Sequence, residues 1–224
     1  VKTLPKTKPQ NEPQQRGERR VVVKAPAENP YIVLAYKVPT LRDIDKDDDV
    51  HALDVLAAVL DGYDNARLPA KLVRTDRVAN SAGASFDSIS RGPSMFLLDG
   101  TPAEGTTIEQ LEQRLRAEVT RIATDGVSAA ELKRVKTQLI ASQVYKRDSI
   151  FGQAMEIGSM EMAGISSRQI DRLIDKLAAV TPEQVKAVAQ KYFSDEQLTV
   201  ASLVPLPLDD ADKKPASAPA GMRH

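Results

Sequence analysis

The stretch DIDKDDDVHALD, at Asp43–Asp54, contains the residues of the chain that are best suited to chemistry. It holds six aspartates and one of the two histidines among the 224 residues. Carboxylates bind calcium, and an imidazole together with carboxylates binds zinc, so the stretch could form either of two kinds of metal site. The alternative is an acidic start to a helix.

The spacing of the aspartates matches a calcium-binding loop only in part. Asp43, Asp45 and Asp47 fall at the first, third and fifth positions, and Asp54 falls at the twelfth. The sixth position must be Gly for a sharp turn, but it is Asp48, and the twelfth should be a longer, bidentate Glu. The spacing therefore argues against calcium.

Zinc would have to be bound by His51 and Asp54, but a zinc site needs at least three protein ligands. The inverted peptidase motif HxxEH, read from His51, puts Asp54 in place of the Glu and Val55 in place of the second His. We therefore predict no metal ligand and no catalytic residue in this chain. His51 is interpreted as a surface residue, and the substrate-binding residues stay unassigned.

The aspartates are instead interpreted as the start of a helix. Val50, Leu53, Leu56 and Leu60 form an apolar face at helical spacing, and Gly62 ends the pattern. Carboxylates at a helix start complement its partial positive charge and can cap its free N–H groups, each contributing about 0.3–1 kcal/mol.

Other kinds of chemistry are excluded by composition and motifs. There is no Cys, which excludes disulfides, thiolate zinc sites and Cys nucleophiles. There is no P-loop, no GxGxxG and no GxSxG pattern. The 31 basic and 31 acidic residues cancel, so nothing indicates a nucleic-acid partner. No apolar run approaches the roughly 18–20 residues of a membrane span.

Composition divides the chain into three parts. Residues 1–18 are rich in Pro, Gln and Lys and are typical of a linker, and residues 208–224 are typical of a disordered tail. Residues 19–207 should form one folded domain. Because the chain opens on Val1 with neither an initiator Met nor a signal peptide, we expect a piece of a longer precursor.

Five strands are predicted. The run at Tyr31–Lys37 is almost continuously apolar, so we expect a central strand that is covered on both faces or heavily packed. Arg91–Pro93 is a turn signal that should join two strands in a hairpin. The other strands are expected at Arg20–Lys24, Asn80–Ser90, Ser94–Gly100 and Leu198–Val204.

Helices dominate the second half of the chain, and four of their starts fit the capping box. In this motif the first hydroxyl accepts from the backbone N–H three residues later, and the acid or amide side chain at that later position accepts from the backbone N–H of the first residue. The boxes are at Thr107–Gln110, Ser128–Glu131, Ser166–Gln169 and Thr181–Gln184. Another helix is expected around Phe151–Met162, and a short one at about 65–74. Paired strands and a block of helices predict an α+β fold of two layers, with an antiparallel-rich mixed sheet and helices packed on one face.

Four segments in order carry a resemblance to a known family. They are RGERRVVVKAPAENPYIVLAYKVP (Arg16–Pro39), HALDVLAAVLDGYDNARLPAKLVR (His51–Arg74), SAAELKRVKTQLIASQVYKRDSIFGQAMEIGSMEMAG (Ser128–Gly164) and VTPEQVKAVAQKYFSDEQLTVASLVP (Val180–Pro205). Together they resemble the second, non-zinc-binding half of the short bacterial insulinase-type (M16) zinc peptidases. The resemblance covers nearly all of the predicted folded region and implies a LuxS/M16 peptidase-like half.

The resemblance implies a duplicated molecule, in which two similar halves enclose a substrate chamber. The first half would carry HxxEH and bind zinc, and the second would complete the chamber for peptide substrates. Many second halves supply an Arg and a Tyr in or after the second hairpin strand, here Met95–Gly105. This chain has no Tyr between Tyr63 and Tyr145 and no Arg between Arg91 and Arg114, so that pair is not assigned.

Two functions follow from the resemblance. The first is the non-catalytic C-terminal half of a periplasmic zinc metalloendopeptidase, with zinc held only by an HxxEH-bearing half or partner subunit. The alternative is a catalytically inactive scaffold or assembly subunit of a larger complex. An exposed chamber face would also favour a homo-oligomer.

Overall fold

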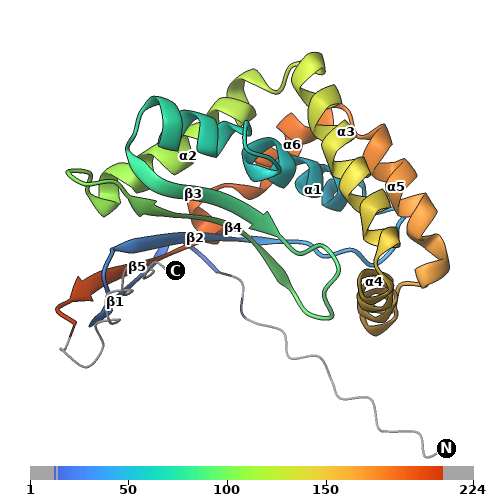
Figure 1. The fold of residues 1–224 in the computed structure, drawn as a ribbon, viewed down its shortest axis with the longest axis horizontal. Coiled ribbons are helices and arrows are strands. Elements are labelled where there is room, and N and C mark those ends of the chain that lie inside the picture. The colour runs from blue at the N-terminus through green and yellow to red at the C-terminus, as the bar shows by residue number, and fades with distance from the viewer. Residues whose placement is uncertain (1–12, 14, 209–224) are drawn as a thin grey trace, which may run out of the picture.

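A computed structural model gives the fold of residue 13 and residues 15–208 (Figure 1). Its five-stranded sheet has the order β1-β5-β2-β4-β3. β1 and β5 are parallel, and every other neighbouring pair is antiparallel. The strands are β1 (Arg19–Pro26), β2 (Tyr31–Val38), β3 (Ala79–Phe86), β4 (Ser94–Pro102) and β5 (Leu198–Leu206). The last strand therefore lies between the first two, which draws both ends of the described chain into one sheet.

The helices lie on one side of this sheet, as the fold class predicted (Figure 1). α1, α2 and α6 pack on the strands, whereas α3, α4 and α5 lie beyond them at one end of the layer. The helices are α1 (Asp48–Asp61), α2 (Ile108–Asp125), α3 (Ala129–Tyr145), α4 (Ile150–Ala163), α5 (Ile170–Ala179) and α6 (Pro182–Tyr192). A π-helical segment, η1, covers Pro69–Thr75, near the short helix expected at 65–74.

The central strand β2 is covered on one face only. Ile32, Leu34 and Tyr36 alternate toward the helices and are buried, whereas Val33 and Ala35 on the other face are partly exposed. Of the two expected alternatives, cover on both faces is absent within the described chain, whereas heavy packing is observed on one face. Since β2 is the middle strand of the sheet, its second apolar face is left open to solvent.

The core is built mainly from Leu, Val, Ile and Ala. A small aromatic cluster fixes the end of α6 against the sheet. The ring of Phe193 lies 4.7 Å from that of Tyr36 and 4.9 Å from that of Phe96, the latter in an edge-to-face arrangement. Such pairs stabilise by roughly 0.5–1.5 kcal/mol beyond the burial of their area.

The capping boxes at Thr107 and Thr181 are confirmed, each with both reciprocal hydrogen bonds. At Ser128 only half of the box forms, because the hydroxyl caps the helix while the Glu131 side chain pairs with Arg67. The predicted box at Ser166 is wrong. Residues Ser167–Gln169 form a 3-10 turn, and the Ser167 N–H donates to the carboxylate of Glu161 instead.

The hairpin between β3 and β4 is confirmed, but β3 is shorter than predicted. It ends at Phe86 rather than Ser90, and residues 87–93 form a longer connection. The guanidinium of Arg42 donates to the carbonyl oxygens of Ser90, Arg91 and Gly92. These backbone groups are thus satisfied by a side chain instead of a strand partner.

The described part of the predicted linker contacts the domain. Gln15 is buried and its side-chain amide donates to the carbonyl of Leu198 at 2.7 Å. Glu18 accepts from Arg116 on α2 and pairs with Arg20. The remainder of the linker and all but one residue of the predicted tail (208–224) fall outside the described residues. No helix within the described ranges is long and apolar enough to cross a membrane.

Candidate functional site

The aspartates before α1 fold the turn that leads into the helix. The carboxylate of Asp47 accepts from the backbone N–H groups of Arg42 (2.7 Å) and Asp43 (2.8 Å). Asp43 in turn accepts from the N–H of Asp45 at 3.0 Å. Asp47 is the N-cap residue, yet its side chain makes no capping bond to the helix. The predicted side-chain cap is therefore wrong there, because the carboxylate is used by the preceding turn.

Three further aspartates join the start of α1 and the turn before it to the helices of the second half. Asp45 pairs with Arg172, and Asp48 accepts from Lys176 at 3.1 Å, both on α5. Asp49 accepts from Lys191 (2.6 Å) and from the hydroxyl of Tyr192 (2.7 Å) on α6. Burial would raise the pKa of Asp49, but these two donors hold it below its ordinary value. The acidic stretch is thus a set of contacts between helices.

His51 is buried, and its interpretation as a surface residue is wrong. Its Nε2–H donates to the carbonyl oxygen of Ile44 at 2.9 Å, and its Nδ1 has no partner among the described residues. Because Nε2 bears the proton, that nitrogen offers no lone pair to a metal. The helical spacing did not reveal this burial because the turn before α1 folds back over the ring.

These residues do not fit the zinc site of an active peptidase. His51 uses its Nε2 for a backbone bond, Asp54 is shorter than Glu, and Val55 cannot bind a metal. Within the residues that the structure describes, no three His, Cys, Asp or Glu side chains are grouped to hold a metal ion.

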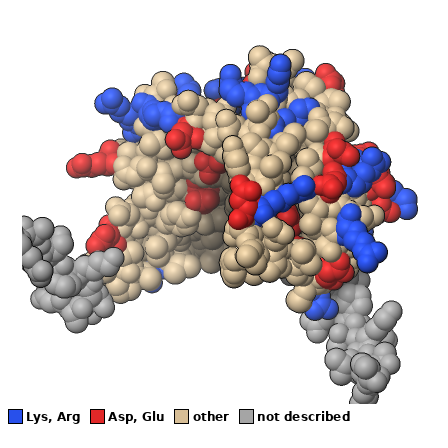
Figure 2. Space-filling view, turned by 45° about the vertical axis from the view of Figure 1, so that its right-hand side comes forward, with Lys and Arg blue, Asp and Glu red and all other residues tan. Residues whose placement is uncertain are grey.

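A hollow of about 650 Å³ lies beside α1, between β3 and the helices α3 and α4. Figure 2 shows this side of the molecule, with acidic side chains gathered around a depression in the surface. Asp54 and Asp61 enter it from α1, Asp87 from the hairpin connection and Glu156 from α4, while Lys146 follows α3. We call this hollow, defined by these five charged residues, the α1 hollow.

Asp54 has the most perturbed carboxyl of the α1 hollow. Burial raises its pKa to about 7, and the hydrogen bond to Ser88 opposes this shift only in part. The like charge of Asp87 raises it further, whereas the charge of Lys146 acts in the opposite direction. Few nearby groups stabilise the ionised form of this carboxyl. In the register read from His51, Asp54 stands at the position of the Glu in HxxEH.

Asp61 lies where α1 meets the edge strand β3. Its carboxylate accepts from the N–H of Ala84 at 3.2 Å, and burial together with nearby Asp99 raises its pKa. A Cβ added to Gly83 would lie 3.1 Å from an oxygen of Asp61 and 3.2 Å from one of Asp99. The missing side chain of Gly83 thus lets two carboxylates approach the same point of the sheet edge. Tyr31 donates to Asp99 at 2.6 Å.

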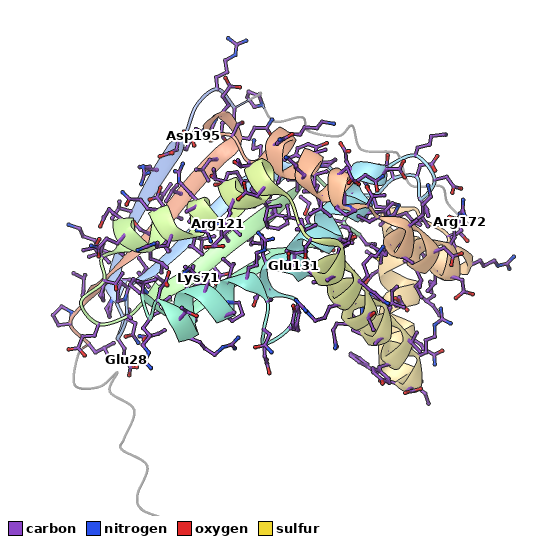
Figure 3. The ribbon with its side chains drawn as sticks, turned by 90° about the horizontal axis from the view of Figure 1, so that it is seen from above. Glu28, Lys71, Arg121, Glu131, Arg172 and Asp195 are labelled. Carbon is purple, nitrogen blue, oxygen red and sulfur yellow. The ribbon has the colours of Figure 1, made fainter. Side chains whose placement is uncertain are left out.

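A second polar depression contains no comparable excess of charge. It lies between η1 and α2, where Figure 3 labels Lys71 and Arg121, and it is lined by both acidic and basic residues. Arg67 at its edge is paired with Glu131 at the start of α3 through two bonds of 2.8 Å. This pairing is structural, because it joins the residues just before η1 to α3.

Sequence reasoning considered Asp54 only as a metal ligand, for calcium or for zinc, and did not assign Asp61, Asp87 or Glu156. One signal was present in the sequence. The apolar helix at Ile150–Ala163 carries only two charged residues, Glu156 and Glu161, and both are acids. An isolated carboxylate on an otherwise apolar helix is a candidate for a site, but its neighbours across the hollow come from distant segments.

The family model for the peptidase M16 inactive domain matches residues 1–139, more than half of the chain. The chain belongs to the M16 peptidase family, as an inactive domain. The uncharacterized zinc protease YmxG of Bacillus subtilis is 24% identical over 147 residues, which cover 66% of this chain and 36% of that protein.

Solved structures agree with this M16 assignment at the level of the fold. A protease from Helicobacter pylori superimposes with a TM-score of 0.82 and 24% identity, over 91% of this chain and 48% of that one. A peptidase M16 inactive domain from Pseudomonas fluorescens gives a TM-score of 0.75 and 17% identity, over 92% and 48%. The M16 domain described here thus spans about half, or less, of the length of these relatives.

In this family, the inactive M16 half generally pairs with an active half, and the zinc belongs to that partner. The chemistry of His51, Asp54 and Val55, which cannot together bind zinc, agrees with this division. The α+β class, the helices on one face of the sheet and the family expected from the four segments are all confirmed.

Proposed function

We propose that this domain is the non-catalytic C-terminal half of a periplasmic zinc metalloendopeptidase, and that it closes a substrate chamber opposite an HxxEH-bearing half. The observation that carries the proposal is the match to the inactive M16 domain in a chain that covers only about half of a related protease. A half of that length leaves room in the whole protein for a second domain of similar size.

The surface of the domain supports a partner. The outward face of the sheet is open, and Val21, Val22, Tyr31 and Met95 are exposed there or on the edge strand β1. On α4 only Met160 is buried, and the large apolar side chains elsewhere on this helix and just before it are exposed. Several large apolar side chains exposed on the same elements are typical of an interaction site.

The test is reconstitution with the HxxEH-bearing segment or subunit encoded beside this domain. Hydrolysis of an unstructured fluorogenic peptide is measured for each half alone and for the mixture, with zinc quantified by elemental analysis. We expect turnover and bound zinc only when the HxxEH-bearing half is present, and strong stimulation by this domain. Zinc at one equivalent together with turnover in this domain alone would contradict the proposal.

A scaffold role is the second candidate, favoured by the missing Arg and Tyr between Met95 and Gly105. The two candidates differ in the sequence that precedes Val1 or lies in a neighbouring gene. An HxxEH motif about one domain upstream, or in the product of a neighbouring gene, supports the peptidase. A degenerate motif, or none in either place, supports the scaffold. The periplasmic location rests on the resemblance and is tested by fractionating cells that carry the full-length protein.

A further inference from the structure

The segment Gln15–Arg20, which ends with the first residues of β1, is attached to the domain at two places. We call it the strap. Its first attachment is the side chain of Gln15, which is only 5% exposed. The amide nitrogen donates to the carbonyl oxygens of Leu198 (2.7 Å) and Gly17 (3.0 Å), and the amide oxygen accepts from the hydroxyl of Thr199 at 3.5 Å. Because glutamine side chains are mostly exposed, this buried amide marks a specific contact with the start of β5.

The strap turns at Gly17, whose backbone φ is +97°. This conformation is open to glycine and strained for a residue with a Cβ. A Cβ added to Gly17 would meet no atom within 4 Å. A side chain at this position would therefore disturb the strap through backbone strain alone and not through a clash.

The second attachment is an ionic cluster that joins the strap to α2 and to the turn before β5. Glu18 accepts from Arg116 of α2 at 2.5 Å and pairs with Arg20 at 2.5 Å. Arg20 also donates twice to Glu112 of α2, at 2.7 and 2.9 Å. Arg116 pairs in addition with Glu112 and with Asp195, which Figure 3 labels, each at 2.7 Å. Three segments that are far apart in the chain thus meet in one cluster.

The inner members of this cluster are partly sheltered from water. The side chain of Glu112 is 8% exposed, and those of Glu18 and Arg116 are 24% exposed. Pairs at this depth are screened less than pairs at the surface. Removing one partner leaves the other charges without compensation, which weakens the whole contact. The strap is therefore held by a neutral amide before Gly17 and by a charged contact after it.

We propose that the strap is a clamp, which fixes the point and the direction at which the chain preceding Gln15 enters the domain. A Pro- and Gln-rich linker would otherwise leave that entry loosely defined. With the clamp closed, whatever precedes the strap is held beside the start of β5. With Glu18 released from Arg116, it can take a wider range of positions. The inference concerns this chain alone, so it holds or fails independently of the proposed peptidase function.

The test measures a distance across the strap in the 224-residue chain. Because the chain contains no Cys, Pro13→Cys and Arg114→Cys create only two attachment sites for nitroxide labels. Pro13 precedes the strap, and Arg114 is exposed on α2. Double electron–electron resonance then gives the distribution of distances between the labels. We expect one narrow distribution, and a broad one in the chain with an unchanged strap would contradict the clamp.

Three variants release the strap in different ways. Gln15→Ala removes the buried amide, Gly17→Ala strains the turn, and Glu18→Gln removes the shared charge. Each should raise the fraction of molecules outside the main distance several-fold. Two matched controls should leave the distribution unchanged. Glu28→Gln makes the same charge change in the exposed turn after β1, and Gly105→Ala adds a Cβ at another positive φ (+81°) with no atom within 4 Å.

Salt separates the charged attachment from the amide. Raising NaCl from about 0.01 M to about 1 M shortens the range of charge interactions from about 30 Å to about 3 Å. The distance distribution of the unchanged strap should therefore broaden, whereas the Glu18→Gln variant should respond much less. An equal salt response of the two chains would contradict the charged attachment.

Circular dichroism checks that each variant keeps its helices, which is expected because the strap lies outside the apolar core. The inference is overturned if folded Gln15→Ala, Gly17→Ala and Glu18→Gln chains all keep the narrow distribution. It is also overturned if the Glu28→Gln and Gly105→Ala controls broaden the distribution as much as their matched strap variants do.

Discussion

The imidazole of His51 donates to the carbonyl oxygen of Ile44 at 2.9 Å, and both residues are almost fully buried. This bond connects the first turn of α1 to the loop that precedes it. The residue type that first suggested a metal site therefore has a structural role. The turn that contains Ile44 and the first turn of α1 therefore stabilise each other.

Replacing His51 by Leu should destabilise the domain. The change leaves the buried carbonyl of Ile44 without a donor, at a cost of about 1–2 kcal/mol, since loss of the unpartnered Nδ1 offsets part of the penalty. Urea unfolding followed by circular dichroism measures the difference. A variant as stable as the unchanged chain would show that the bond makes no net contribution.

The two-bond contact between Arg67 and Glu131 should be among the stronger ion pairs of the domain. Both side chains are about one-fifth exposed, so water screens the pair only in part. Arg67→Lys and Glu131→Gln should each lower the free energy of unfolding by about 1–3 kcal/mol. In a double-mutant cycle the combined loss should be smaller than the sum of the single losses. Strict additivity would show that the two residues act independently.

Asp54 should make stability decrease as pH rises from about 4 to 7. Its pKa is about 7 in the folded domain, whereas the ordinary pKa of an aspartate is 3.8, so the folded state binds the extra proton in that range. Above pH 7 the buried charge is fully unfavourable. Asp54→Asn should therefore stabilise the domain by about 2 kcal/mol at pH 8 and give no such gain below pH 4. Thermal unfolding across pH measures this, and a pH-independent difference would contradict it.

Glu112 should have the opposite pH dependence. Burial would raise its pKa, but hydrogen bonds and charges of Arg20 and Arg116 hold it below the ordinary value of 4.5. Its contribution to stability is therefore present above pH 4.5 and is lost as pH falls through the lower folded pKa. Glu112→Gln should cost about 1–3 kcal/mol at pH 7 and much less near pH 3. An equal cost at both values would exclude an ionic contribution.

Local sequence signals predicted most of the elements. Thr107 and Thr181 mark their helix starts because both halves of a capping box lie within four residues, and Gly62 ends α1 where the apolar spacing stops. The alternation in β2 was hidden in the sequence, because residues on its open face are apolar as well. That feature is understandable if another part of the whole protein covers this face.

The α1 hollow could not be predicted, because its charged residues come from segments far apart in the chain. Asp54 and Glu156 are separated by about a hundred residues, and only the packing of α3 and α4 beside α1 brings them to one cavity. The contacts of Asp45 and Asp49 with α5 and α6 were missed for the same reason. Local reasoning assigned these aspartates to their own helix, whereas their partners lie in distant helices.

The most direct test of the central claim is peptide hydrolysis by the HxxEH-bearing half with and without this domain, at saturating zinc. The account predicts no turnover by this domain alone, weak turnover by the HxxEH-bearing half, and a large increase when both are mixed at equal concentration. Full activity of the HxxEH-bearing half alone, unchanged by this domain, would contradict the proposal that this inactive M16 half completes the substrate chamber.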